Sequence, residues 1–158
     1  LCGVESSNYY AMAGAMGGAV SIGLGLALAQ PERRILVCTG DGELLMNIGA
    51  LATVSVMKPA NLGILCVDNG QYGETGNQQS HTGQCTNLAS MAHGAGIPKV
   101  FSVSKEEDIT VARNIIDESM ETFFVHLKVH DGPPAKIKRS LDAQLTKSSF
   151  RKNLLGHP

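Results

Sequence analysis

Two short polar segments, each directly after an apolar run, carry residue types that can bind a metal ion and a phosphate. The first is Gly40-Asp41-Gly42-Glu43, which follows the apolar run 35–39 and opens a helical pattern. Its glycines let the backbone approach a ligand closely, and a helix N-terminus offers unpaired N–H groups to a phosphate. A carboxylate among phosphates is repelled unless a cation lies between them, so Asp41 predicts a Mg²⁺ ion.

The second segment is Asp68-Asn69-Gly70-Gln71-Tyr72-Gly73, which follows the apolar run 62–67. Mg²⁺ takes about six oxygen ligands in near-octahedral geometry. Asp41, Asn69, one backbone carbonyl, two phosphate oxygens and a water would complete such a set. Each segment alone is typical of an ordinary turn. Two of them, each after a buried strand and with one helix between, indicate a single shared ligand.

The elements that must position these segments alternate along the chain. Helical patterns cover 11–30, 43–58, 86–95 and 104–120, and strand patterns cover 35–39, 62–67, 100–103 and 122–129. Ser104 and Glu107 have the spacing of a capping box, which predicts the start of the last of these helices. The alternation predicts an α/β fold of three layers, a mostly parallel sheet with helices on both faces. Ligands bind at the carboxyl ends of the strands in such sheets.

Together the two segments resemble the thiamine-diphosphate signature, in which Gly-Asp-Gly is followed at a set distance by a pair of asparagines. Here Gly40-Asp41-Gly42 is followed, after 25 residues, by Asp68-Asn69. The similarity runs from Ala13 to about Val129 and is to the diphosphate-binding domain of thiamine-diphosphate-dependent 2-oxo acid decarboxylases. The sequence departs from the pattern at Asp68, where the first asparagine is usual.

The resemblance implies the residues of the cofactor site. The Mg²⁺ ligands would be Asp41, Asn69 and the main-chain carbonyl of Gln71. The Gly14 carbonyl would receive the aminopyrimidine amine, and Met16 would hold the cofactor in its bent form. The expected cofactor-binding residues are Gly14, Met16, Gly40, Asp41, Gly42, Glu43, Asn69, Gln71, Tyr72 and Gly73.

Within this family the chain is most similar to the β-type subunit of sulfopyruvate and phosphonopyruvate decarboxylases, on segments 46–53 and 72–78. That likeness implies release of CO₂ and an aldehyde from a small 2-oxo acid. It also implies a partner subunit whose pyrimidine-binding domain supplies the activating glutamate, and self-association is a further expectation. We therefore expect the chain alone to bind cofactor poorly and to decarboxylate nothing.

Two alternatives remain at this stage. One keeps the cofactor but changes the reaction to carboligation of the acetolactate-synthase kind. The other is a non-catalytic nucleotide-binding module, which Gly23-Leu24-Gly25 and Gly40-Asp41-Gly42 would suit. Neither segment completes G-x-G-x-x-G after a strand, which weakens the second alternative.

The long polar loop 68–85 also holds side chains that could act on a substrate. We expect His81 and Glu74 to be catalytic, with Asn77 and Gln78 as further substrate contacts. A histidine titrates near neutrality and could donate a proton or bind an acidic group of the substrate. The alternative for both residues is a solvated position on the loop.

Composition and charge bound the remaining expectations. A net charge of −1 and 4% aromatic residues disfavour nucleic-acid binding. The apolar stretch 11–29 is rich in glycine, which favours a buried helix over a membrane span, and no secretory leader is expected. Four cysteines without metal-ligand spacing indicate reduced thiols and a cytoplasmic location. Residues 1–133 are expected to form the cofactor-binding domain, and 134–158, with six basic residues against Asp142, a basic C-terminal tail.

Overall fold

The structure, a computed structural model, describes residues 7–12, 14–130, 132 and 142–156. These fall into two compact units. The central unit is Met16–Asp131, and the terminal unit combines Leu1–Ala15 with Gly132–Pro158. The predicted functional segments, apart from Gly14, belong to the central unit.

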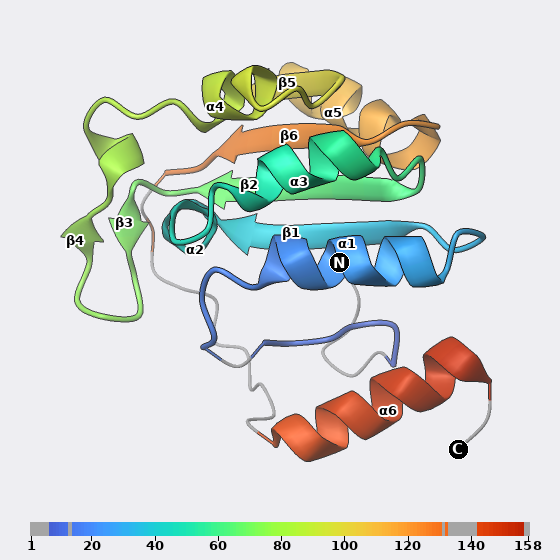
Figure 1. Ribbon diagram of the computed structural model, residues 1–158. Coiled ribbons are helices and arrows are strands. Elements are labelled where there is room, and N and C mark those ends of the chain that lie inside the picture. Colours follow the sequence, from blue (N-terminus) through green and yellow to red (C-terminus); the bar gives the residue numbers. More distant parts are fainter. Residues whose placement is uncertain (1–6, 13, 131, 133–141, 157–158) are drawn as a thin grey trace. The chain divides into compact units, whose positions relative to one another are not determined.

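A four-stranded sheet forms the middle of the central unit (Figure 1). Its strands, in spatial order, are β1 (Ile35–Gly40), β2 (Leu62–Asp68), β6 (Phe123–Lys128) and β5 (Lys99–Val103). All three pairings are parallel, as the alternating sequence pattern predicts. Gly40 pairs with Val67, so the residues that follow β1 and β2 leave the sheet side by side at its carboxyl edge.

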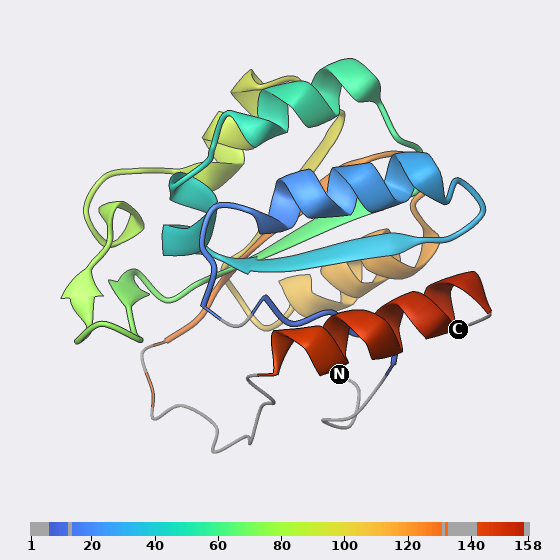
Figure 2. The ribbon, with the colours of Figure 1, turned by 60° about the horizontal axis from the view of Figure 1, so that its bottom comes forward.

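Helices cover both faces of this sheet, which confirms the predicted fold class. Figure 2 shows α5 on the side opposite α1 and α3. The helices of the central unit are α1 (Ala19–Ala29), α2 (Asp41–Leu45), α3 (Ala50–Met57), α4 (Leu88–Gly94) and α5 (Asp108–Glu118). One core contains Val20, Leu51, Leu88 and Phe124, from α1, α3, α4 and β6. Val125, the next residue of β6, packs with the α5 side in a second core.

One predicted helix is shorter than expected, and another is divided in two. The helix predicted over 11–30 begins only at Ala19, because Gly14 and Gly17 adopt positive φ angles of 90° and 80°. The helix predicted over 43–58 is two helices, α2 and α3. Between them Asn47 donates its side-chain N–H to the Gly17 carbonyl at 3.0 Å, which ties this break to the loop that precedes α1.

The predicted capping box is wrong. Helix α5 begins at Asp108 rather than Ser104. The N-cap residue of α5 is Glu107, and its side chain makes no capping hydrogen bond. The Asp108 carboxylate accepts the backbone N–H groups of Ser104 and Lys105 at 3.1 and 3.2 Å, so it orders the turn before α5 rather than the first turn of the helix.

The polar loop after β2 contains short regular elements. These are β3 (Gln71–Tyr72), β4 (Gln78–Gln79) and the 3₁₀ turn η1 (His81–Gly83). β3 and β4 pair antiparallel, so the loop folds back on itself and returns η1 toward the end of β2. This return is what brings new side chains to the carboxyl edge of the sheet.

The terminal unit contains α6 (Ala143–Leu155), which lies within the predicted basic tail. Asp142 caps its first turn by accepting the Leu145 N–H at 2.9 Å. The Tyr10 and Phe150 rings lie 5.5 Å apart between centroids, so the segment near residue 10 packs on α6. No helix among the described residues is long and apolar enough to cross a membrane.

Candidate functional site

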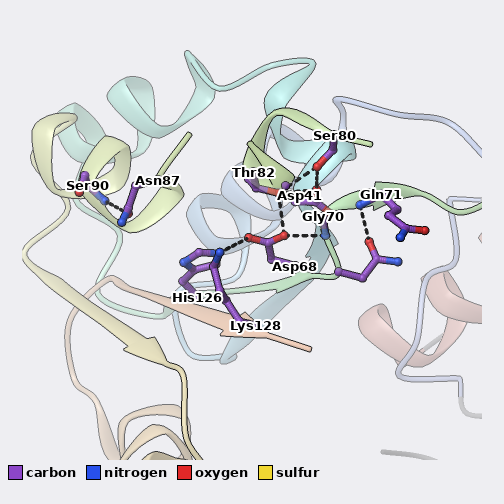
Figure 3. A network of polar contacts seen from close by, with 12 residues as sticks. Asp41, Asp68, Gly70, Gln71, Ser80, Thr82, Asn87, Ser90, His126 and Lys128 are labelled. Atoms are coloured by element: carbon purple, nitrogen blue, oxygen red, sulfur yellow. Dashed lines mark hydrogen bonds and ion pairs between the residues drawn. The ribbon is translucent and has the colours of Figure 1, made fainter. Parts of the chain in front are cut away.

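Two aspartates define a buried polar site at the carboxyl edge of the sheet (Figure 3). Asp41 is the first residue of α2 and Asp68 the last of β2, and only 2% and 3% of their surfaces are exposed. The parallel register brings the two aspartates close together, because Asp41 directly follows Gly40, Asp68 directly follows Val67, and Gly40 pairs with Val67. The sequence-predicted convergence of the two segments is thus present in the structure.

Hydroxyl groups hold the Asp41 carboxylate. Ser80 and Thr82 both donate toward Asp41 Oδ2, Thr82 from 2.8 Å. Both side chains are buried, although they come from the polar loop. The loop reaches this position because the Ser80 N–H donates to the Gly70 carbonyl at 2.8 Å. A Cβ on Gly83 would lie only 2.8 Å from that same carbonyl, so this close return requires glycine.

Asp68 is satisfied by a different set of donors. Oδ1 accepts the Gly70 N–H at 2.9 Å and the Thr82 hydroxyl at 2.7 Å. Oδ2 lies 2.7 Å from His126 Nε2. Burial raises the pKa of the Asp68 carboxyl, but the hydrogen bonds from Thr82, His126 and Gly70, with the charge of His126, outweigh it and hold the pKa below its usual value. Asp68 therefore stays ionised.

The two carboxylates differ in their compensation. Asp68 has His126 in contact and the Lys128 ammonium at 3.9 Å. Among the described residues, the hydrogen-bond donors to the Asp41 side chain are the Ser80 and Thr82 hydroxyls, and all of these contacts fall on Oδ2. A buried carboxylate whose partners are neutral hydroxyls is suited to a cation on its second oxygen.

The turn after β2 carries the other predicted metal ligands. Asn69 Oδ1 accepts the Gln71 N–H at 3.1 Å, which fixes the course of the backbone between them. No group of three or more His, Cys, Asp or Glu side chains in the described part of the chain is placed to hold a metal. The predicted ligands, one carboxylate, one amide and one carbonyl, would suit Mg²⁺ that takes its remaining oxygens from phosphate and water.

Two further predicted residues shape the site through protein contacts. Glu43 Oε1 accepts the Ala19 N–H at 3.0 Å, so it caps α1 from another helix. Its Oε2 accepts from Thr39, the buried threonine of β1. A Cβ on Gly42 would overlap the Tyr72 ring, so the ring lies directly on the Gly40–Gly42 turn.

The remaining predicted residues lie at different places. Gly14 belongs to the terminal unit, whereas Met16 begins the central unit and is 43% exposed. Gly73, Glu74, Asn77 and Gln78 are exposed around the β3–β4 hairpin. His81 is exposed between the buried Ser80 and Thr82. The catalytic roles of His81 and Glu74 stay predictions.

Sequence reasoning missed Ser80, Thr82 and His126. His126 lies inside the apolar run Phe123–Lys128, where a buried polar side chain needs a hydrogen-bond partner. That position in the sequence was the available signal that it has a polar partner. Ser80 and Thr82 gave no signal, because they lie in a loop of similar polar residues.

Cys66 lies beneath these carboxylates in β2. Burial raises the pKa of its thiol, and the charges of Asp41, Asp68 and Glu43 raise it further. The thiol therefore stays protonated and serves as a small core residue.

Comparisons with known proteins place this chain among similar sequences. Residues 4–127 match the family described as "Thiamine pyrophosphate enzyme, C-terminal TPP binding domain". The chain is 46% identical over 111 residues to the sulfopyruvate decarboxylase subunit beta of Methanocaldococcus jannaschii, which covers 70% of this chain and 58% of that protein. It is 34% identical over 135 residues to the phosphonopyruvate decarboxylase of Streptomyces hygroscopicus, covering 85% and 33%.

A solved structure gives the same fold. The thiamine diphosphate-dependent 4-hydroxybenzoylformate decarboxylase of Rhodococcus jostii RHA1 matches with a TM-score of 0.63 at 21% identity, over 74% of this chain and 24% of that one. These comparisons confirm the resemblance seen in the sequence. The chain spans less than two thirds of the length of the two curated relatives named above.

Proposed function

This chain belongs to the thiamine pyrophosphate enzymes, as their C-terminal TPP-binding domain, and from this we propose that it is the cofactor-binding subunit of a 2-oxo acid decarboxylase. The proposed substrates are small 2-oxo acids of the sulfopyruvate or phosphonopyruvate type, after the relatives' names. When bound, thiamine diphosphate supplies the nucleophilic carbon and the electron sink that decarboxylation needs.

The observation that carries the proposal is the buried Asp41 carboxylate, held on one oxygen by two hydroxyls. In the proposal Asp41, Asn69 and the Gln71 carbonyl hold Mg²⁺, which offsets the repulsion between Asp41 and the diphosphate. The N-terminus of α2 and the closely packed Gly42 backbone receive the phosphate oxygens. The Tyr72 ring packs against that backbone.

A partner chain completes the proposed enzyme. A relative named "subunit beta" supports an assembly of more than one kind of chain. The partner would supply the pyrimidine-binding domain and its activating glutamate, and His81 and Glu74 remain the candidates for substrate contacts from this chain. A cytoplasmic location is proposed from the thiols of Cys66 and Cys85, which form no disulfide bond in the described part of the chain.

Titration calorimetry tests the cofactor site. Thiamine diphosphate is titrated into the chain, with its partner present, in the presence and absence of Mg²⁺. Binding should require Mg²⁺, and Asp41→Ala should lower the affinity by more than the ~10–100-fold typical of changes to outer-shell residues. Asp117→Ala is the matched control, because this exposed aspartate pairs with Arg113 on α5.

Metal-independent binding, or an Asp41→Ala variant that binds as the parent chain does, would refute the proposed site. Analysis of the products separates the reactions. An aldehyde is expected, and an acetohydroxy acid would support carboligation in its place.

A further inference from the structure

A single threonine hydroxyl stands between the two carboxylates of the site. Thr82 Oγ1 is 2.8 Å from Asp41 Oδ2 and 2.7 Å from Asp68 Oδ1. Ser80 Oγ contacts Asp41 Oδ2 as well, and lies 2.9 Å from Thr82 Oγ1. A hydroxyl has one proton to donate. The Ser80 and Thr82 hydroxyls therefore have two protons for the four oxygen–oxygen contacts that they make. Thr82 can donate its proton fully to only one of the two aspartates.

The contacts continue from Asp68 to a third strand. His126, from β6, lies 2.7 Å from Asp68 Oδ2 and is 2% exposed. The resulting chain of contacts runs His126–Asp68–Thr82–Asp41 and joins β6, β2, η1 and α2. Every side chain in it is more than nine-tenths buried. Water cannot replace one of these contacts cheaply in such a site.

We propose that His126, Asp68 and Thr82 are positioning residues, which fix the Asp41 carboxylate so that its Oδ1 is available to a divalent cation. This inference rests on the proposed function, because it takes Asp41 as the ligand. Anchoring Oδ2 restricts the rotation of the carboxylate before the cation arrives. The entropy of ordering that side chain is then lost on folding rather than on binding.

The shortage of protons gives this arrangement its preference for a cation. With both carboxylates ionised, Thr82 must leave one of them with a lone pair facing its oxygen. A cation on Asp41 Oδ1 offsets part of the negative charge of the pair and so reduces this repulsion, while Ser80 and Thr82 keep Oδ2 in place. His126 offsets the second charge, so Asp68 anchors Thr82 without leaving an unpaired buried charge.

The first test compares two buried threonines. Thr82→Val removes the shared hydroxyl. Thr122→Val is the control: it removes a buried hydroxyl that donates to the Pro59 carbonyl at 2.6 Å. Thr122 directly precedes β6, whereas His126 lies nearer the carboxyl end of that strand. The Mg²⁺ affinity is measured by calorimetry with thiamine diphosphate at saturation and the partner present. Thr82→Val should weaken Mg²⁺ binding about tenfold or more, as expected for a lost hydrogen bond to a charged group.

Thr82→Ser keeps the hydroxyl and should restore the Mg²⁺ affinity to within about threefold of the parent. Thr122→Val should lower the melting temperature while leaving that affinity unchanged. Equal Mg²⁺ affinity in the parent and Thr82→Val, or an equal loss in Thr122→Val, would overturn the inference. A parent chain that binds no Mg²⁺ would overturn the proposed function, and this inference with it.

The second test addresses the pair behind Thr82. His126→Gln removes the buried charge partner in contact with Asp68 and should weaken Mg²⁺ binding about tenfold. The double variant Asp68→Asn/His126→Gln replaces the pair by two amides, and the Asn oxygen still accepts from Thr82. It should recover most of the affinity, since the effects of residues in contact are not additive. Additive losses in the double variant would contradict a positioning pair, and this test stands if Thr82→Val fails to fold.

Discussion

At the scale of single residues, Asp41 and Asp68 show how neighbouring carboxylates acquire different tasks. They leave the sheet side by side, yet Asp68 is matched by His126 while Asp41 is held by hydroxyls. The departure from the usual asparagine at position 68 therefore comes with a histidine from β6. The sequence shows both residues but not their contact, because 58 positions separate them.

The lowered pKa of Asp68 predicts a stability that depends on pH. A carboxyl whose pKa is lower in the folded chain stabilises it above the unfolded pKa, about 3.9. That contribution is lost as the pH falls through the lower, folded value. The difference in free energy of unfolding between the parent and Asp68→Asn should therefore be largest near neutrality and shrink as the pH falls below about 4.

Urea unfolding of the metal-free chain between neutral and acidic pH measures this difference. Asp117→Asn, which changes an exposed aspartate on α5, controls for general effects of charge. A difference for Asp68→Asn that is the same at every pH would show that the carboxylate is not stabilised by its neighbours.

At the scale of elements, the sequence predicted strands better than helix boundaries. The four predicted strands are present. They were predictable because a short apolar run bounded by polar turns is typical of a buried strand. The helix starts were missed where contacts outside the helix decide them. Glu43 caps α1 from α2, and Asn47 holds the break between α2 and α3. Neither partner is visible from local spacing.

Helix α1 offers a prediction from two glycines two positions apart. A Cβ on Gly23 would overlap the Val37 side chain of β1, whereas the space around Gly25 is open among the described residues. Gly25→Ala should stabilise the chain by about 0.5–1 kcal/mol through helix propensity. Gly23→Ala should destabilise it by about 1–3 kcal/mol through overpacking.

Thermal and urea unfolding of both variants provide the measurement. Each glycine is the other's control, since the local sequence and the helix are shared. Equal effects at both positions would mean that the close packing of α1 on β1 is not what requires glycine at position 23.

At the scale of the whole molecule, the sequence predicted the fold and the edge at which the site lies. Both follow from the order of elements and from the two polar segments. The hydroxyls around Asp41 were not predictable, because the hairpin of β3 and β4 must first return the loop to β2. Only the three-dimensional course of the loop separates Ser80 and Thr82 from their exposed neighbours.

The proposed assembly predicts that the purified chain decarboxylates no 2-oxo acid by itself. Addition of a partner chain with the pyrimidine-binding domain should restore turnover, because in the proposed assembly the activating glutamate comes from that domain. Release of CO₂ from sulfopyruvate or phosphonopyruvate, followed with and without the partner, gives the measurement. Turnover by the chain alone at a rate comparable to the mixture would exclude the proposal that the partner supplies the activating glutamate.

The position of β6 has a consequence during synthesis on the ribosome. It is the last strand of the central sheet to be made, and it lies between two strands that are made earlier. A nascent chain that ends before His126 lacks the residue that balances Asp68, however complete its first strands are. Unfinished chains therefore lack the complete polar network, so incomplete translation products should compete poorly with finished subunits for cofactor.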